Sequence, residues 1–409
     1  MFKTAPTATH EAGLAALNAF IPQAGADYAR WRNHDFGPSG DNRVSGLSPW
    51  LRHRLLLEES AIQAAIDRHG LDGAEKFIQE VCWRTYWKGF MARRPVHWHD
   101  YRAACDEAND QIARDRRLAA AFDRALAGET DIEAFNFWVH VLRETGYLHN
   151  HARMWFASIW IFTLELPWAL GADFFLRHLL DGDPASNTLS WRWVAGLHTP
   201  GKPYIARASN INKYTDGRFN PGYQINTQVT APEGVERPPL GPAPLPVDWR
   251  ITPTTGLLIT EDDLLPETLF GQPDWPLVIA AQSTDWRSSG PVADRPRAFA
   301  YAGLEDALTR NPGRAQHGPI DLASADGLNA VRTAAREAGV DRLLTPYVPT
   351  GPTADAMAAL DPILAAVGIE RIPVPRDWDV CHWPAATHGF FRFWKAARPL
   401  IVEQMTSPG

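Results

Sequence analysis

Two carboxylates, an amide and two tryptophans lie within one short stretch near the middle of the chain. The run LLDGDPASNTLSWRW contains Asp181, Asp183, Asn187, Trp191 and Trp193. Aromatic rings can pack against a large planar molecule, while a few polar groups orient its edge. The stretch therefore predicts a binding site for a large planar cofactor, which packing alone does not identify.

Two further runs carry polar and apolar groups on one helical face. In ETGYLHNHARMWFASIW, Asn150 and Met154 are one helical turn apart and share a face. In GAEKFIQEVCWRTYWKGFM, residues 73–91, helical spacing unites a second set. That set is Glu80, Trp83, Arg84 and Trp87. A carboxylate among tryptophans is unusual in a core, where an unpaired acid is costly to bury, so this face predicts a cleft wall.

The run RVSGLSPWLRHRLLLEESAIQAAI has the features of a helix start. Ser48 is a typical capping residue and Pro49 suits the first helical position. The free N–H groups of such a start, with the hydroxyls of Ser45 and Ser48 nearby, can bind a phosphate. By themselves, these residues fit an ordinary capped helix better.

The elements that must position these residues are mainly helices. Residues 1–230 are predicted to form a helical domain, 231–270 a proline-rich linker, and 271–409 a smaller α/β domain. In the last range, the strand patterns PLVIAAQ, RLLTPYV and ERIPVP alternate with the helix patterns NAVRTAAREAGV and ADAMAALDPILAAVGI. This alternation is typical of a doubly wound, Rossmann-like parallel sheet, although the chain has no glycine-rich dinucleotide motif or Walker loop.

Composition restricts the class of protein. The chain has 409 residues, of which 45% are hydrophobic and 21% are charged, as expected for a globular protein with more than one domain. Its net charge of −7 argues against nucleic-acid binding. However, residues 1–230 contain 25 Lys and Arg against 25 Asp and Glu, so the excess acid lies further along the chain. A neutral domain can still focus a basic patch around a cleft.

Cysteines and apolar runs indicate the cellular setting. Cys82, Cys105 and Cys381 form no metal-binding or disulfide pattern, which fits a reducing compartment and a protein without a metal. The N-terminus lacks the features of a signal peptide, and the run MWFASIWIFTLELPW is interrupted by Glu165 and Pro167. We therefore expect a cytoplasmic protein without membrane contact. We also expect a monomer, although the sequence itself carries no signal for the oligomeric state.

The motifs resemble those of the FAD-binding helical domain of the photolyase/cryptochrome family. The family's HN-x-x-R-M motif reads here as residues 149–154, and its DGD-x-x-x-N-x-x-x-W-x-W motif as residues 181–193. Several residue types at fixed separations make a specific signal. The resemblance implies FAD as the cofactor. The implied cofactor-binding residues are Ser45, Gly46, Leu47, Ser48, Asn150, Arg153, Asp181, Asp183 and Asn187.

The family repairs ultraviolet-damaged DNA by light-driven electron transfer from reduced FAD. The resemblance implies catalytic roles for Glu80 and Asn150, which would hydrogen-bond the lesion, and for Asn187, which would lie beside the flavin N5. Trp191 and then Trp168 would relay an electron inward to the flavin. The implied substrate- or DNA-binding residues are Glu80, Trp83, Arg84, Met154, Trp193 and Arg207.

The chain departs from the family pattern at several positions. In the phosphate motif T-S-x-L-S-P-x-L, Val44 replaces the threonine and Gly46 replaces a frequent arginine, which predicts a looser cradle. The outermost tryptophan of the usual relay is absent, and counting back from Asn150 leads to the neighbourhood of Asp115. Either the relay is shorter than usual, or another tryptophan forms its outer end at the protein surface. The candidates for that end are Trp87, Trp138 and Trp160.

Three functions stay open. Repair of cyclobutane pyrimidine dimers by a deoxyribodipyrimidine photo-lyase is favoured, because Asn187 is the photolyase choice and because His149 and His151 do not form the adjacent pair of (6-4) photolyases. His151 is expected to be a surface residue. The alternatives are a cryptochrome-like photoreceptor without repair activity and a flavin-free scaffold. The C-terminal α/β domain is either a rearranged antenna-type domain, which would bind a second pigment, or an unrelated appendage.

Overall fold

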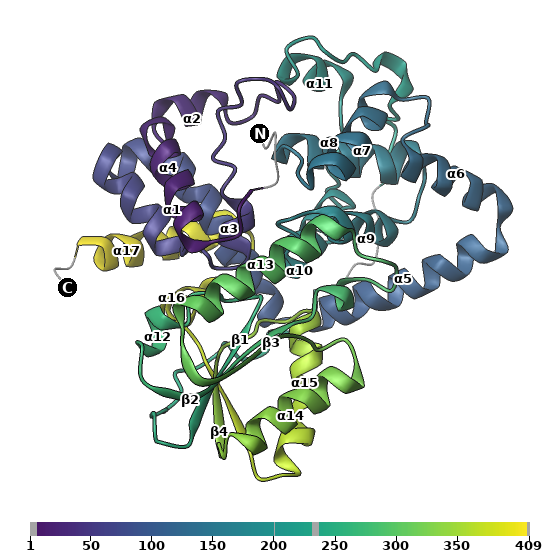
Figure 1. The fold of residues 1–409 in the computed structure, drawn as a ribbon. Coiled ribbons are helices and arrows are strands. Elements are labelled where there is room, and N and C mark those ends of the chain that lie inside the picture. Colours follow the sequence, from purple (N-terminus) through teal and green to yellow (C-terminus); the bar gives the residue numbers. More distant parts are fainter. Residues whose placement is uncertain (1–5, 200, 231–236, 407–409) are drawn as a thin grey trace.

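The computed structural model describes residues 6–199, 201–230 and 237–406. Figure 1 shows a helical part above a smaller part built on a sheet. The helical part contains α1 (His10–Phe20), α2 (Ala26–Trp31), α3 (Ser48–Arg52), α4 (Glu58–Ala92), α5 (Val96–Arg114), α6 (Arg116–Ala127), α7 (Glu133–Thr145), α8 (Asn150–Ser158), α9 (Trp168–His178), α10 (Pro184–Val194) and α11 (Ala208–Tyr214). The predicted fold class, mainly helical with a smaller α/β part, is confirmed.

The long helix α4 carries the predicted cleft wall. Gly70 interrupts it with φ of 69°, a left-handed conformation that favours glycine, and the helix changes direction there. Beyond this kink, residues such as Phe77, Ile78 and Val81 are buried in the main core, while Glu80 on the same stretch stays partly exposed. Most of the buried residues of α4 lie beyond this kink.

The sheet has the strand order β3-β2-β1-β4-β5, and every pairing is parallel. Its strands are β1 (Thr255–Thr260), β2 (Trp275–Gln282), β3 (Gly313–Asp321), β4 (Arg342–Pro346) and β5 (Glu370–Val374). Leu258 faces the core formed with α14 (Ala325–Glu337) and α15 (Pro352–Ala365), whereas Leu257 faces the main core, to which α13 (Asp294–Arg310) contributes. The doubly wound parallel sheet is confirmed.

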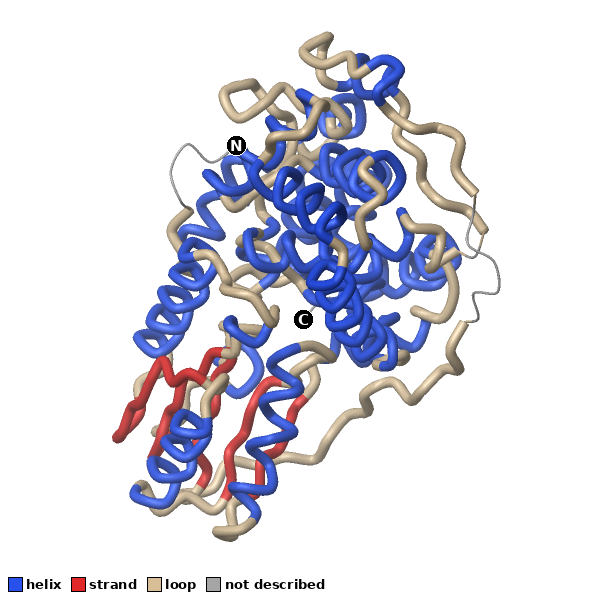
Figure 2. Tube along the Cα trace, turned by 90° about the vertical axis from the view of Figure 1, so that its right-hand side faces the viewer, coloured by secondary structure: helices blue, strands red, loops and turns tan. Residues whose placement is uncertain are grey.

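The sheet begins earlier than the sequence predicts. Strand β1 and the short helix α12 (Glu267–Phe270) both fall in the range 231–270, which we predicted to be linker. All six residues of β1 are buried because it lies in the centre of the sheet, so it shows no polar alternation to reveal it. The extended segment without helix or strand is 237–254, visible as a long loop in Figure 2, and 231–236 lie outside the described residues.

The chain leaves the sheet after β5 and returns to the helical part. There it forms α16 (Asp377–His382), a short 3₁₀ turn (Trp383–Ala385) and α17 (Phe390–Thr406). In Figure 1, α17 lies beside the N-terminal helices and away from the sheet. The predicted domain range 271–409 is therefore wrong at its end, because the apolar side chains after β5 pack on α4.

A buried network of ions joins the two parts. Arg52 Nη1 lies 2.7 Å from Asp262 Oδ1, and Arg54 Nη2 lies 2.7 Å from Asp379 Oδ1. Asp263 pairs with both Arg54 and Arg376. Removing one member of such a network leaves an uncompensated buried charge, so the contacts fix how the parts pack. They occupy Asp262 and Asp263 at the carboxyl end of β1, the edge where doubly wound sheets usually bind ligands.

Candidate functional site

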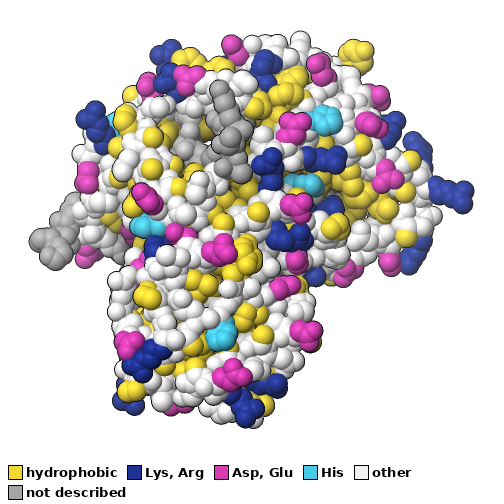
Figure 3. All heavy atoms as spheres, viewed as in Figure 1, with side chains coloured by type: hydrophobic (Ala, Val, Ile, Leu, Met, Phe, Trp, Pro, Cys, Tyr) yellow, Lys and Arg dark blue, Asp and Glu magenta, His cyan; other side chains and the backbone are white. Residues whose placement is uncertain are grey.

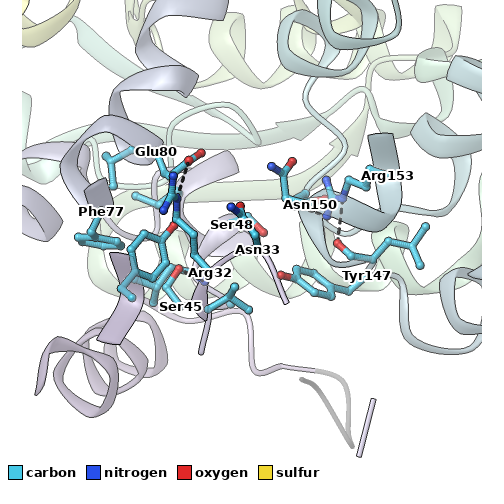
Figure 4. Close-up of a pocket in the computed structure, with 17 residues that line it drawn as sticks. Arg32, Asn33, Ser45, Ser48, Phe77, Glu80, Tyr147, Asn150 and Arg153 are labelled. Atoms are coloured by element: carbon cyan, nitrogen blue, oxygen red, sulfur yellow. Dashed lines mark hydrogen bonds and ion pairs between the residues drawn. The ribbon is translucent and has the colours of Figure 1, made fainter. Parts of the chain in front are cut away.

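Two adjoining cavities lie where α3, α4, α8 and α10 meet. Their volumes are about 590 Å³ and 200 Å³, and both are lined by Ser48, Glu80, Asn150, Arg153 and Asp181. Figure 4 shows the smaller cavity, with Glu80 and Arg32 on one side and Asn150 and Arg153 on the other. A space of this size suits a drug-sized or cofactor-sized ligand.

The predicted face of α4 forms one wall of the larger cavity. All four of its members, Glu80, Trp83, Arg84 and Trp87, line that cavity. Glu80 pairs with Arg32 at 3.6 Å, a contact drawn in Figure 4. Burial raises the pKa of Glu80, and the positive charge of Arg32 partly opposes this rise. The cleft-wall prediction is confirmed.

Arg84 is less available than the other members of this face. Its guanidinium pairs with the buried carboxylate of Glu58 and donates to the carbonyl oxygen of Arg52. Burial alone would raise the pKa of Glu58, but Arg54 and Arg84 outweigh it and hold this pKa at about 2. Arg84 therefore supports the wall through its guanidinium, and its contact with DNA stays a prediction.

Helix α8 contributes Asn150, Arg153 and Met154 to the larger cavity. Arg153 donates from Nη2 to Asp181 Oδ2 at 2.8 Å and from Nε to the Leu148 carbonyl at 2.9 Å. The other oxygen of Asp181 is buried and has no hydrogen-bond partner among the described residues. Because Asp181 lines both cavities, this oxygen is a candidate acceptor for an N–H group of a ligand.

The second carboxylate of the Asp-Gly-Asp motif, Asp183, also lines the larger cavity, but both of its oxygens have partners within the protein. Asp183 Oδ1 accepts from the backbone N–H of Ser186 at 2.8 Å and so caps α10, while Oδ2 lies 3.2 Å from Lys88 and 3.9 Å from Arg52. Burial alone would raise the pKa of Asp183, but Lys88 and Arg52 hold it well below its usual range. Asn187, one turn further, donates from its amide to the Ala172 carbonyl at 2.8 Å, which fixes its orientation.

The four residues of the predicted phosphate cradle line the smaller cavity. These residues are Ser45, Gly46, Leu47 and Ser48. Gly46 has φ of 64°, a conformation in which a larger residue would be strained. Ser48 does not cap α3 as we predicted. The capping position is Leu47, which makes no side-chain cap, and the Leu47 N–H donates to Ser45 Oγ at 3.3 Å.

The tryptophans separate into two groups. Trp191 and Trp193 line the larger cavity. Trp168 and Arg207 line neither cavity: Trp168 packs near Tyr101, with ring centroids 6.0 Å apart, and Arg207 is exposed at the start of α11. The alternative outer relay members are all buried, with exposed fractions of 7% for Trp87, 1% for Trp138 and 0% for Trp160.

Other residues reach the cavities without having been predicted. His151 lines the larger cavity, stacks on Trp155 with centroids 4.5 Å apart and bonds the Asn33 carbonyl at 2.9 Å, so its prediction as a surface residue is wrong. Asn33 itself lines both cavities, and Arg32 lines the smaller one. For Arg32 and Asn33, the only feature of the sequence that could have indicated a role in the site is the polar and aromatic run DYARWRNHDF, in which both lie.

The distribution of charge on the surface is weaker evidence for DNA binding than the cavity is. On the face drawn in Figure 3, basic and acidic side chains are interspersed over most of the surface. Basic side chains gather where α5 meets α6, where Arg114, Arg116 and Arg117 are exposed.

No helix in the described part of the chain is long and apolar enough to cross a bilayer. Among the same residues, no cluster of His, Cys, Asp or Glu suits a metal ion.

Buried histidines predict a loss of stability in mild acid. Burial lowers the pKa of His97 and His198 to about 3 and that of His149 to about 4. Unfolded histidines take up protons below about pH 6.5, while these three stay neutral in the fold, so stability is full above that pH and falls as the pH drops. Each such histidine is expected to cost about 2 kcal/mol between pH 7 and pH 5. Glu59, whose pKa burial raises to about 7, acts in the opposite direction.

Thermal unfolding measured from pH 7 to pH 5 tests this expectation. The midpoint should fall steadily, and a His97→Phe variant should show a shallower dependence because one neutral buried imidazole has gone. A midpoint that stays constant over this range would contradict the assignment of these histidines as neutral.

Comparison with known proteins bears on the helical part. Residues 77–223 match the FAD binding domain of DNA photolyase. A deoxyribodipyrimidine photo-lyase from Streptomyces griseus is 34% identical over 194 residues, which are 47% of this chain and 40% of that protein. One from Thermus thermophilus is 32% identical over 206 residues, 49% of this chain and 46% of that protein. The chain thus spans less than half the length of these relatives.

Among solved structures, a class III photolyase from Agrobacterium tumefaciens is 25% identical to this chain. The similarity covers 51% of this chain and 43% of that one, with a TM-score of 0.43.

Proposed function

We propose, because the helical part of this chain belongs to the photolyase/cryptochrome family, that the protein binds FAD and repairs cyclobutane pyrimidine dimers in DNA under blue light. The observation that carries the proposal is the larger cavity. Its walls bring together residues from helices far apart in the sequence. Arg207, which is also implied for DNA binding, lines neither cavity, but five residues that the resemblance implies for contact with the lesion line the larger one. These residues are Glu80, Trp83, Asn150, Met154 and Trp193.

The residues present fit FAD. Asp181 offers a buried unpartnered oxygen, and Arg153 holds the same carboxylate in place from its other side. Asn187 is fixed by its bond to the Ala172 carbonyl, and the backbone around Ser45 and Ser48 lines the smaller cavity, where a phosphate would be held. When bound and reduced, FAD supplies the light-driven electron for dimer cleavage.

The remaining residues would receive the lesion. A damaged base pair turned out of the duplex loses stacking that costs a few kcal/mol, and aromatic faces recover about 1–3 kcal/mol for each stacked base. Trp83 and Trp193 are two of the aromatic rings in the cavity wall, and Trp193 packs against Tyr204, with ring centroids 5.3 Å apart. Asn150 and Glu80 supply hydrogen-bonding groups beside them.

The test is light-dependent repair of an oligonucleotide with one defined thymine dimer, with the absorption spectrum of the same sample recorded. Repair under blue light and none in darkness is the expected result. A yellow protein that repairs nothing would support the cryptochrome-like photoreceptor, and a colourless one would support the flavin-free scaffold. The same spectrum tests whether the α/β part binds a second pigment, which is one of the two alternatives left open for it.

Recharging of the flavin should depend on Trp191 more strongly than on any exposed tryptophan. Trp191 lines the larger cavity and is 2% exposed, whereas Trp168, the next member of the implied relay, lines neither cavity. We expect Trp191→Phe to slow photoreduction of bound FAD by an external reductant at least about tenfold, as Phe is a poorer electron donor. Trp168→Phe should slow it as well if the relay passes through that ring. Trp249→Phe is the control, since Trp249 is 36% exposed, packs against Phe270, lines neither cavity and is not a candidate member of the relay.

A further inference from the structure

One side of the Trp83 indole is covered by a phenyl ring from the opposite end of the chain. The ring centroids of Trp83 and Phe390 are 3.8 Å apart and their planes differ by 9°. Phe390 begins α17 and is 4% exposed. Trp83 lines the larger cavity and Phe390 does not, so the indole stands between the phenyl ring and the cavity.

The backbone that presents Phe390 is tied to α4. The Tyr86 hydroxyl donates to the His388 carbonyl at 2.5 Å, and Arg94 Nη2 donates to the Thr387 carbonyl at 2.9 Å. One turn further along α17, Phe393 packs against the Tyr86 ring with centroids 5.6 Å apart. The position of the phenyl ring is therefore set by α4, the helix that carries Trp83, and by Arg94 just beyond its end.

The rest of the C-terminal segment 377–406 lies along the same helix. Trp378 donates from its indole to Thr85 Oγ1 at 3.0 Å. Trp383 packs so close to Gly89 that a Cβ there would come within 2.8 Å of its ring. The side chain behind Trp83 thus comes from the chain beyond the sheet and not from the matched range 77–223.

We propose that Phe390 is a positioning residue for Trp83, holding the indole at the cavity wall in the orientation in which an everted base can stack on it. The inference rests on the proposed function, which assigns base stacking to Trp83. A parallel ring contact restricts the rotation of the indole, and a side chain that is ordered before binding loses less entropy when the ligand arrives. The segment 377–406 thereby takes part in substrate recognition without touching the substrate.

The experiment compares three variants in the full chain. Phe390→Leu keeps a buried apolar side chain but removes the ring, Phe390→Tyr keeps the ring, and Phe391→Leu is the matched control because Phe391 is 75% exposed. We expect Phe390→Leu to weaken binding of a thymine-dimer oligonucleotide roughly three- to tenfold. Binding of the undamaged oligonucleotide, FAD content and unfolding temperature should change little. Phe390→Tyr and Phe391→Leu should match the parent.

A second readout does not depend on DNA. The stacked pair should contribute to the near-ultraviolet circular dichroism, so Phe390→Leu should alter that spectrum in the parent but not in a Trp83→Phe background. A folded Phe390→Leu protein with parental affinity for damaged DNA, or with an unchanged spectrum, overturns the inference. A parent that binds damaged and undamaged DNA alike contradicts the proposed function, and with it the recognition role; the spectrum then tells whether Phe390 orients Trp83 at all.

Discussion

Asp183→Asn is expected to destabilise the protein by about 3–5 kcal/mol, the usual cost of leaving a buried charge without its partner. The carboxylate is 4% exposed and faces Lys88 and Arg52, which are 3% and 1% exposed. An asparagine can still cap α10 through its carbonyl oxygen, so the loss comes from the two cations. Urea unfolding, followed by far-ultraviolet circular dichroism, measures the change in the free energy of unfolding.

Asp181→Asn provides the matched control within the same motif. Asp181 pairs with Arg153, whose side chain is 23% exposed and can be partly solvated, so we expect a smaller loss of stability, about 1 kcal/mol. Asp181 lines both cavities and one of its oxygens has no partner among the described residues, so this variant should instead lose FAD during purification. If Asp181→Asn were the less stable of the two, or Asp183→Asn kept its stability but lost FAD, the division of roles between the two carboxylates would be wrong.

This division shows where the sequence is informative and where it is not. The motif identifies both carboxylates as part of one site, but their orientations depend on what lies opposite each. Lys88 and Arg52 belong to other helices, and Arg52 is in turn fixed by Asp262, which lies beyond the linker. No local pattern predicts a pair of residues that far apart, so the sequence does not reveal the ion pairs that hold Asp183.

Helical spacing, by contrast, places side chains reliably on one face. Glu80 and Trp83 on α4, like Asn150 and Met154 on α8, reach the larger cavity as predicted. Spacing does not predict the loop around Asn33, because a loop has no periodic hydrophobic pattern. It also does not predict the central strand β1, because a strand that is buried on both faces shows no alternation of polar and apolar residues. The segment 377–406 was assigned to the α/β domain, but it packs on the helical part. The pattern of an amphipathic helix such as α17 shows that one face is covered, but it does not show which apolar surface covers that face.

Trp83→Ala is expected to weaken binding of a thymine-dimer oligonucleotide roughly five- to hundredfold, the range that corresponds to about 1–3 kcal/mol for the loss of one stacked base. Binding of undamaged duplex should change much less, because phosphate contacts carry most non-specific affinity. The flavin absorption spectrum should stay as in the parent, since Asp181, Asn187 and the phosphate cradle are untouched. Fluorescence anisotropy with both oligonucleotides measures the two affinities on the same preparation.

Trp168→Ala is the control for this prediction. It removes a tryptophan of the same helical part that lines neither cavity, so it should leave the affinity for the damaged oligonucleotide unchanged. Equal affinity of Trp83→Ala and the parent for damaged DNA would show that the α4 face is not the lesion wall. The effect of Phe390→Leu must also stay below that of Trp83→Ala, because a ring that only orients the indole cannot contribute more than the indole itself. A larger effect of Phe390→Leu would mean that α17 supports other parts of the cavity besides Trp83.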